Sequence, residues 1–194
     1  MSYNAKQFSC IILAGGEGKR ADGVDKGLIL YKNKPLIEHI INAVKFQVDD
    51  IVISANRNIE NYQKYSENVI TDASNIYRGP LAGIAASLPY CKHGLVLIVA
   101  CDMPALPTNL IERLSVDIKN KSICIATVDK HHQLAMIIKK DLLESIQQRL
   151  NDNQLKLIQW VESAPYSTIT FDDIPQAFIN LNNIPDNNAS ACKN

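Results

Sequence analysis

The chain has 194 residues, of which 46% are hydrophobic, so it is long enough to bury a core without disulfides. Its 20 Lys and Arg residues balance its 20 Asp and Glu residues, and this neutral charge argues against general nucleic-acid binding, which usually leaves a basic excess. The longest apolar run, residues 95–101, is too short to span a bilayer, and the first residues lack the pattern of a signal peptide, so no membrane partner is expected.

Predicted strands alternate with predicted helices along the chain. The apolar run over 8–14 indicates a buried first strand, and the glycine-rich residues 15–27 indicate a loop. We expect further strands over 51–55, 68–71, 95–101, 122–128, 134–138 and 167–171, and helices over 35–46, 58–65, 79–88, 107–118, 141–150 and 155–161. This order predicts an α/β, three-layer, Rossmann-like fold with a mostly parallel sheet, in which ligands bind beyond the carboxyl ends of the strands.

The loop after the first strand has the chemistry of a phosphate cradle. It reads LAGGEGKRADGVDKG from Leu13 to Gly27 and is neither a Walker A loop nor a dinucleotide fingerprint. Glycines let backbone N–H groups approach an anion without a Cβ clash, and Lys19, Arg20 and Lys26 add positive charge that suits a triphosphate. The alternative is a flexible, charged surface loop, which the preceding strand and the three basic residues disfavour.

Polar residues also follow three other predicted strands. Ser54 and Asn56 end the strand at 51–55, and Asp72 follows the strand at 68–71, although Asn and Asp are also common in ordinary turns. Asp102 comes directly after the continuously apolar strand 95–101, which is typical of a central parallel strand. A carboxylate there is a candidate ligand for Mg²⁺, which prefers hard oxygen donors. The alternative role, a helix N-cap, is disfavoured because Asp102 lies well upstream of the helix expected at 107–118.

These segments together resemble the signature of the MobA family, the molybdenum cofactor guanylyltransferases. The matching strings are LAGGxxxRxxGxDKG from Leu13, SANR from Ser54, GPLAG from Gly79 and CDMP around Asp102. Ala21, Ser54, Gln133 and Lys156 stand where the family usually has Met, Asn, Pro and Arg. The resemblance implies catalytic roles for Asp102, Lys26 and Arg20, with Mg²⁺ on Asp102. The nucleotide site that it implies comprises Leu13, Ala14, Gly15, Gly16, Lys26, Ser54, Asn56, Asp72, Gly79 and Asp102.

The acceptor side carries a sparser resemblance. It implies contacts from His132, Lys156, Asn180 and Asn182, the last two in an FxNxN segment over 178–182. From the residues alone, the pair at 131–132 favours a turn between two strands over a metal site, because no further ligand lies at a suitable spacing.

The function that the resemblance implies is transfer of GMP from GTP to molybdopterin, with release of pyrophosphate. A related cytidylyl or sugar-phosphate nucleotidyltransferase, or a non-catalytic nucleotide-binding module, stays open. We expect one domain over 1–194, with a nucleotide-binding half over about 1–104, an acceptor-binding half over about 105–182 and a polar tail over 183–194. We expect a monomer that makes transient contacts with cofactor-biosynthesis or acceptor proteins.

Five cysteines without a Cys-x-x-Cys pair indicate free, buried thiols, among them Cys10, Cys101 and Cys124, and hence a reducing, cytoplasmic setting.

Overall fold

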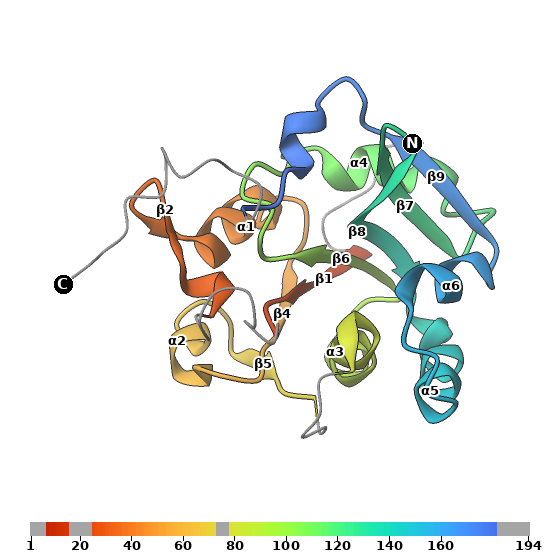
Figure 1. The fold of residues 1–194 in the computed structure, drawn as a ribbon, viewed down its shortest axis with the longest axis horizontal. Helices are drawn as coiled ribbons and strands as arrows, with labels where there is room; N and C mark the ends of the chain where they lie inside the picture. The colour runs from red at the N-terminus through yellow and green to blue at the C-terminus, as the bar shows by residue number, and fades with distance from the viewer. Residues whose placement is uncertain (1–6, 16–24, 73–77, 182–194) are drawn as a thin grey trace.

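The computed structural model describes residues 7–15, 25–72 and 78–181. A seven-stranded sheet with the order β5-β4-β1-β6-β8-β7-β9 runs through the molecule (Figure 1). β8 runs antiparallel to its neighbours β6 and β7, and every other neighbouring pair of this sheet is parallel. The predicted α/β fold with a mostly parallel sheet is therefore confirmed. The strands are β1 (Phe8–Leu13), β4 (Asp50–Ser54), β5 (Asn68–Ile70), β6 (Leu95–Ala100), β7 (Ile123–Val128), β8 (His131–Lys139) and β9 (Tyr166–Thr170).

Helices cover both faces of the sheet and bury two separate apolar cores. Because side chains alternate along a strand, Cys10 and Ile12 of β1 enter one core and Ile11 enters the other. The first core packs under α1 (Leu36–Val44), α2 (Ile59–Gln63) and α4 (Leu110–Leu114). The second packs under α3 (Gly79–Ser87), α5 (Leu143–Asn151) and α6 (Leu157–Glu162). Within the described ranges, no helix has both the length and the apolar character needed to cross a membrane.

The structure also tests the predicted cysteine environments. Cys10, Cys101 and Cys124 are buried free thiols, as predicted, and Cys91 is a fourth. Each is at most 4% exposed, so all four act as small apolar side chains in the cores.

Three local predictions need correction. Residues 15–27 were expected to be loop throughout, but Lys26–Leu28 form a 3₁₀ turn. The helix expected over 107–118 is shorter, because α4 ends at Leu114 and a 3₁₀ turn over Ser115–Asp117 follows. The two histidines at 131–132 begin β8 and do not form the turn. That turn is made by Asp129 and Lys130, whose φ angles of 48° and 65° suit a tight hairpin.

A small antiparallel ribbon had no sequence prediction. It consists of β2 (Leu30–Tyr31) and β3 (Lys34–Pro35), joined through Lys32 and Asn33, which both have positive φ. The ribbon links the 3₁₀ turn at Lys26–Leu28 to α1 and stands apart from the main sheet (Figure 1).

The register of three strands brings the predicted strand ends together. Leu13 pairs with Ser54 of β4 on one side and with Ala100 of β6 on the other. The backbone N–H of Ala14 donates to the Ser54 carbonyl at 2.8 Å, and that of Cys101 donates to the Leu13 carbonyl at 3.1 Å. The segments that follow β1, β4 and β6 therefore leave the sheet at one common edge.

Candidate nucleotide site

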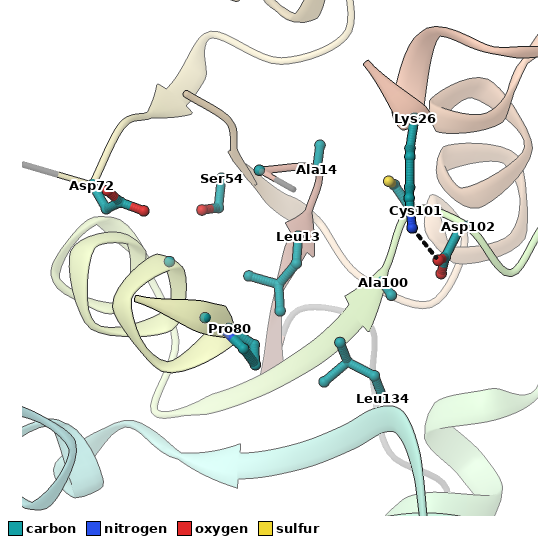
Figure 2. A pocket seen from close by; sticks show the side chains of 13 residues that line it. Leu13, Ala14, Lys26, Ser54, Asp72, Pro80, Ala100, Cys101, Asp102 and Leu134 are labelled. Atoms are coloured by element: carbon teal, nitrogen blue, oxygen red, sulfur yellow. Dashed lines mark ion pairs between the residues drawn. The ribbon is translucent and has the colours of Figure 1, made fainter. Parts of the chain in front are cut away.

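A cavity of about 150 Å³ opens at this edge of the sheet (Figure 2). Its position agrees with the expectation that α/β folds bind ligands beyond the carboxyl ends of their strands. Eight residues that the sequence singled out contribute to its wall, and they come from segments that are well separated along the chain. These eight are Leu13, Ala14, Gly15, Lys26, Ser54, Asp72, Gly79 and Asp102.

Two oppositely charged side chains, Lys26 and Asp102, lie at one end of the cavity. The Lys26 Nζ lies 3.7 Å from Asp102 Oδ2, and Figure 2 shows the lysine side chain extended toward the carboxylate. Both side chains are mostly buried, with exposed fractions of 26% for Lys26 and 13% for Asp102. Asp102 Oδ1 is buried and has no hydrogen-bond partner among the described residues. A buried carboxylate oxygen without a donor is costly, so this atom marks a place for a cation or for a donor from a ligand.

The wall opposite Asp102 is formed where α3 approaches β4. A Cβ atom placed on Gly83 would lie 2.6 Å from Ser54 Oγ and 3.2 Å from Leu13 Cδ2. Any side chain at this position would force Ser54, Leu13 or the helix to shift. α3 begins at Gly79, whose φ of 72° favours glycine, and its first turn lines the cavity with Gly79 and Pro80. Unsatisfied N–H groups at the start of a helix attract anions, so this end of the nine-residue helix suits phosphate.

Ser54 and Asp72 form the side of the cavity away from Asp102, and Asn56 bonds Asp72. Asn56 Nδ2 donates to Asp72 Oδ2 at 2.9 Å, and the Asp72 backbone N–H donates to Asn56 Oδ1 at 3.0 Å. This reciprocal pair ties the loop after β4 to the loop after β5. Asp72 lines the cavity directly, whereas Asn56, its hydrogen-bond partner, does not.

The predicted acceptor residues lie outside this wall. Lys156 is an exposed residue just before α6, and the neighbouring Leu155 carbonyl comes within 3.7 Å of the Cβ position of Gly79. His132 is half-buried on β8, with its ring 6.3 Å from that of Tyr166. Asn180 is exposed. His132 thus belongs to β8 and Lys156 to the start of α6, whereas Asn180 belongs to the C-terminal segment.

The C-terminal segment does reach the charged end of the cavity. The backbone N–H of Leu181 donates to the Asp102 carbonyl at 2.9 Å. Asn180 precedes Leu181 directly, so its backbone lies beside Asp102. Three predicted site residues, Gly16, Arg20 and Asn182, lie outside the described residues.

Five further residues line the cavity without having been predicted as contacts. Gly83 and Pro80 belong to the GPLAG string, so a motif signal was present for both. Ala100 and Cys101 end the strand before Asp102, and their position next to it was the available signal. Leu134 had no signal, because it is an apolar residue on the antiparallel strand β8.

Known proteins resemble this chain over the segments that build the cavity. The model of the MobA-like NTP transferase domain family matches residues 10–164. A molybdenum cofactor guanylyltransferase of Shewanella putrefaciens is 36% identical over 180 residues, which cover 91% of this chain and 92% of the relative. One of Polynucleobacter asymbioticus is 37% identical over 179 residues, which cover 89% of each chain.

Solved structures share the fold. The molybdopterin-guanine dinucleotide biosynthesis protein A of Archaeoglobus fulgidus has a TM-score of 0.71 at 22% identity, with 92% of this chain and 93% of that chain covered. The 4-diphosphocytidyl-2C-methyl-D-erythritol synthase of Anaerococcus prevotii has a TM-score of 0.68 at 14% identity, with 91% of each chain covered. The family match spans most of the sequence and includes the residues from Leu13 to Asp102 that build the cavity. The chain therefore belongs to the MobA-like NTP transferase family and is a nucleotidyltransferase.

Proposed function

We propose that the chain transfers GMP from GTP to molybdopterin, forming molybdopterin guanine dinucleotide and pyrophosphate, with Mg²⁺ as its metal. The supporting observation is the cavity where Gly15, Lys26 and Asp102 meet. It occurs in a chain whose relatives, aligned over about nine-tenths of their length, are named molybdenum cofactor guanylyltransferase. The nucleotide-binding half is assigned to about 1–104 and the acceptor-binding half to about 105–182.

The triphosphate is assigned to the charged end of the cavity. The backbone around Gly15 and the first turn of α3 would donate hydrogen bonds to phosphate oxygens, and the Lys26 ammonium would neutralise charge. Arg20 and Gly16, from the same glycine loop, are assigned to this group by the family pattern. The base and ribose are assigned to the other end, where Ser54 and the Asn56–Asp72 pair lie.

The donor set suits a Mg²⁺ ion that shares its ligands with substrate. Asp102 supplies one carboxylate, and its Oδ1 atom is buried without a partner among the described residues. No three His, Cys, Asp or Glu side chains cluster as a metal site within those residues. That composition agrees with Mg²⁺, which commonly keeps one or two carboxylates and completes its shell with phosphate oxygens and water. When bound, the ion would neutralise charge on the phosphates as pyrophosphate departs.

The reaction needs positioning more than proton transfer. An ionised phosphate oxygen of molybdopterin attacks the α-phosphorus of GTP, and a new P–O bond forms. The bond from that phosphorus to the oxygen bridging to the β-phosphate breaks, and pyrophosphate leaves with the electron pair. Two anions must approach each other, so the contribution of Lys26 is to screen their charge and align them. No general base is required, because a phosphate monoester is already ionised at neutral pH.

The acceptor is assigned to the face beside β8 and α6. His132 lies on β8 and Lys156 directly precedes α6, while Asn180 belongs to the C-terminal segment that bonds Asp102, with Asn182 following it in sequence. Lys156 can meet a phosphate as a point charge, although it lacks the planar fork of arginine.

Pyrophosphate release tests the proposal. GTP, CTP, ATP and UTP are each supplied with and without molybdopterin, in Mg²⁺ and in EDTA. Release only with GTP, molybdopterin and Mg²⁺ would support guanylyl transfer. Release with CTP or with a sugar phosphate would mean that the chain is a nucleotidyltransferase with a substrate other than the proposed GTP or molybdopterin. Tight GTP binding without release under any pairing would support a non-catalytic nucleotide-binding role.

A further inference from the structure

A buried carboxylate lies immediately before Lys26 in the chain. Asp25 is 8% exposed and accepts hydrogen bonds from the Tyr62 hydroxyl and from Asn58 Nδ2, the latter at 3.1 Å. Tyr62 is fully buried, whereas Asn58 lies at the surface and reaches inward. We call these three residues the Asp25 network. Both donors come from the segment after β4, because Asn58 precedes α2 and Tyr62 lies within it.

We propose that the Asp25 network positions Lys26 by fixing the backbone from which its side chain reaches the cavity. The inference rests on the proposed function, because it assumes that Lys26 meets the phosphates of the bound nucleotide. Asp25 itself does not line the cavity. Its backbone carbonyl accepts the Leu28 N–H at 3.1 Å, which closes the 3₁₀ turn that carries Lys26. The Asp25 side chain thus fixes the turn against α2, and the Asp25 carbonyl fixes the conformation of the turn itself.

The chemistry of the network makes it a fixed anchor. A carboxylate buried without donors would be costly, and two donors here satisfy it. Burial first, and then the hydrogen bond to Asp25, raise the pKa of Tyr62 far above its ordinary value. The phenol therefore keeps its proton and stays a donor at physiological pH.

Gly27 lets the tyrosine approach. A Cβ atom on Gly27 would clash with the Tyr62 hydroxyl and would lie 3.1 Å from the ring atom Cε1. The ring is rigid and fully buried, so it could not move aside easily. The residue after Lys26 is thus packed against the same hydroxyl that bonds the residue before it, and Lys26 is held from both sides.

The same loop also reaches the base side of the cavity. Asn58 has φ 50° and ψ 36°, a left-handed conformation that asparagine tolerates better than most residues. Two residues earlier, Asn56 pairs with Asp72. The short segment after β4 therefore holds two residues on opposite sides of the cavity through asparagine side chains, Asn58 bonding Asp25 beside Lys26 and Asn56 bonding the lining residue Asp72.

A double-mutant cycle on GTP affinity tests whether the network acts through Lys26. Affinity is measured by calorimetry in Mg²⁺ without acceptor. Tyr62→Phe removes the hydroxyl and keeps the ring, and we expect GTP to bind about fivefold to tenfold more weakly, as for the loss of one ordinary hydrogen bond. In a Lys26→Ala background the same change should weaken binding by less than about twofold, because both substitutions act through one contact.

Losses that multiply in the double variant would overturn the proposal, and so would an unchanged affinity for Tyr62→Phe alone. Tyr65→Phe is the matched control, because it removes the same atom three residues further along, and its GTP affinity should equal that of the unmodified chain. Should Tyr62→Phe fail to fold, Asn58→Gly keeps the left-handed conformation, removes the other donor and enters the same cycle.

A second readout separates this proposal from the assignment of the substrate. Labelling of the Lys26 amine by an amine-reactive reagent is quantified by peptide mass spectrometry, with and without GTP. We expect GTP to protect Lys26 in the unmodified chain and to protect it less in Tyr62→Phe. Should CTP bind and protect in place of GTP, the proposed function would be wrong, and the cycle run with CTP would still test the network. Equal protection in both chains would contradict the positioning role.

Discussion

The backbone N–H of Leu181 donates a hydrogen bond to the carbonyl oxygen of Asp102, with the two atoms 2.9 Å apart. It joins the C-terminal segment to the end of β6. That segment is anchored upstream by Phe171 and Phe178, whose rings lie 4.8 Å apart in the first core. The residue that we assign to the acceptor, Asn180, is thereby held beside the residue that we assign to the metal.

Leu181→Pro tests this connection, because proline has no backbone N–H to donate. We expect the KM for molybdopterin to rise about tenfold, which corresponds to the loss of one hydrogen bond, while the KM for GTP changes less than about threefold. Leu181→Ala is the control: it keeps the N–H and should stay close to the unmodified chain in both constants. If Leu181→Pro and Leu181→Ala raised the KM for molybdopterin equally, the cause would be the lost leucine side chain and not the lost hydrogen bond.

Asp102→Asn tests the metal assignment. One carboxylate oxygen is buried without a partner among the described residues, and the other lies 3.7 Å from Lys26 Nζ, so its loss should leave the melting temperature nearly unchanged. Turnover should fall by at least about a hundredfold, since a bound metal supplies several kcal/mol of charge stabilisation. EDTA should abolish turnover of the unmodified chain. Asp141→Asn, an exposed substitution on another part of the surface, is the control. An active Asp102→Asn variant that still requires Mg²⁺ would place the ion on another residue.

Local patterns in the sequence were sufficient to predict the strand ends of the site. Leu13, Ser54 and Asp102 each follow or end an apolar run, and the parallel arrangement places such ends at one edge. The sheet prediction succeeded for the same reason, since buried parallel strands are read from continuous apolar runs.

Contacts between distant segments could not be predicted in this way. The Asp25 carboxylate meets Tyr62 through packing of α2 on the 3₁₀ turn, and no spacing in the sequence encodes that distance. Leu134 lines the cavity because β8 inserts antiparallel beside β6. The prediction of a turn at 131–132 was wrong because the hairpin turns at Asp129 and Lys130. Neither residue is the glycine that usually marks a tight turn in a sequence.

Gly83→Ala tests how closely α3 must approach β4. The added Cβ would lie 2.6 Å from Ser54 Oγ, so the serine or the helix must shift, at a cost of about 1–3 kcal/mol in unfolding free energy. GTP affinity should fall as well, because Ser54 lines the cavity. Gly94→Ala is the matched control, since a Cβ there meets nothing within 4 Å. Urea unfolding and calorimetry measure the two effects, and equal stability of both variants would contradict the predicted clash.

Buried thiols should make the fold sensitive to alkaline pH. Burial raises the pKa of the Cys91 thiol from 9.0 to about 12 and also raises the pKa of Cys10, Cys101 and Cys124. Above about pH 9 the unfolded chain loses thiol protons that the folded chain keeps, so the unfolded state binds fewer protons and stability falls as pH rises. Below pH 9.0, the ordinary thiol pKa, the contribution is fully present.

The urea midpoint, measured under reducing conditions, should therefore be level up to about pH 8.5 and decline toward about pH 10.5. The free energy of unfolding derived from the same curves should fall by up to about 1.4 kcal/mol per pH unit for each thiol. Cys91→Ala removes one of these groups and should make the decline shallower, even if the variant is less stable at neutral pH. Tyr62 adds to the same trend at the upper end, because its folded pKa is also raised from 10.0. A midpoint that stays level across the whole range would mean that the thiols ionise within the folded protein, which their burial in the two cores opposes.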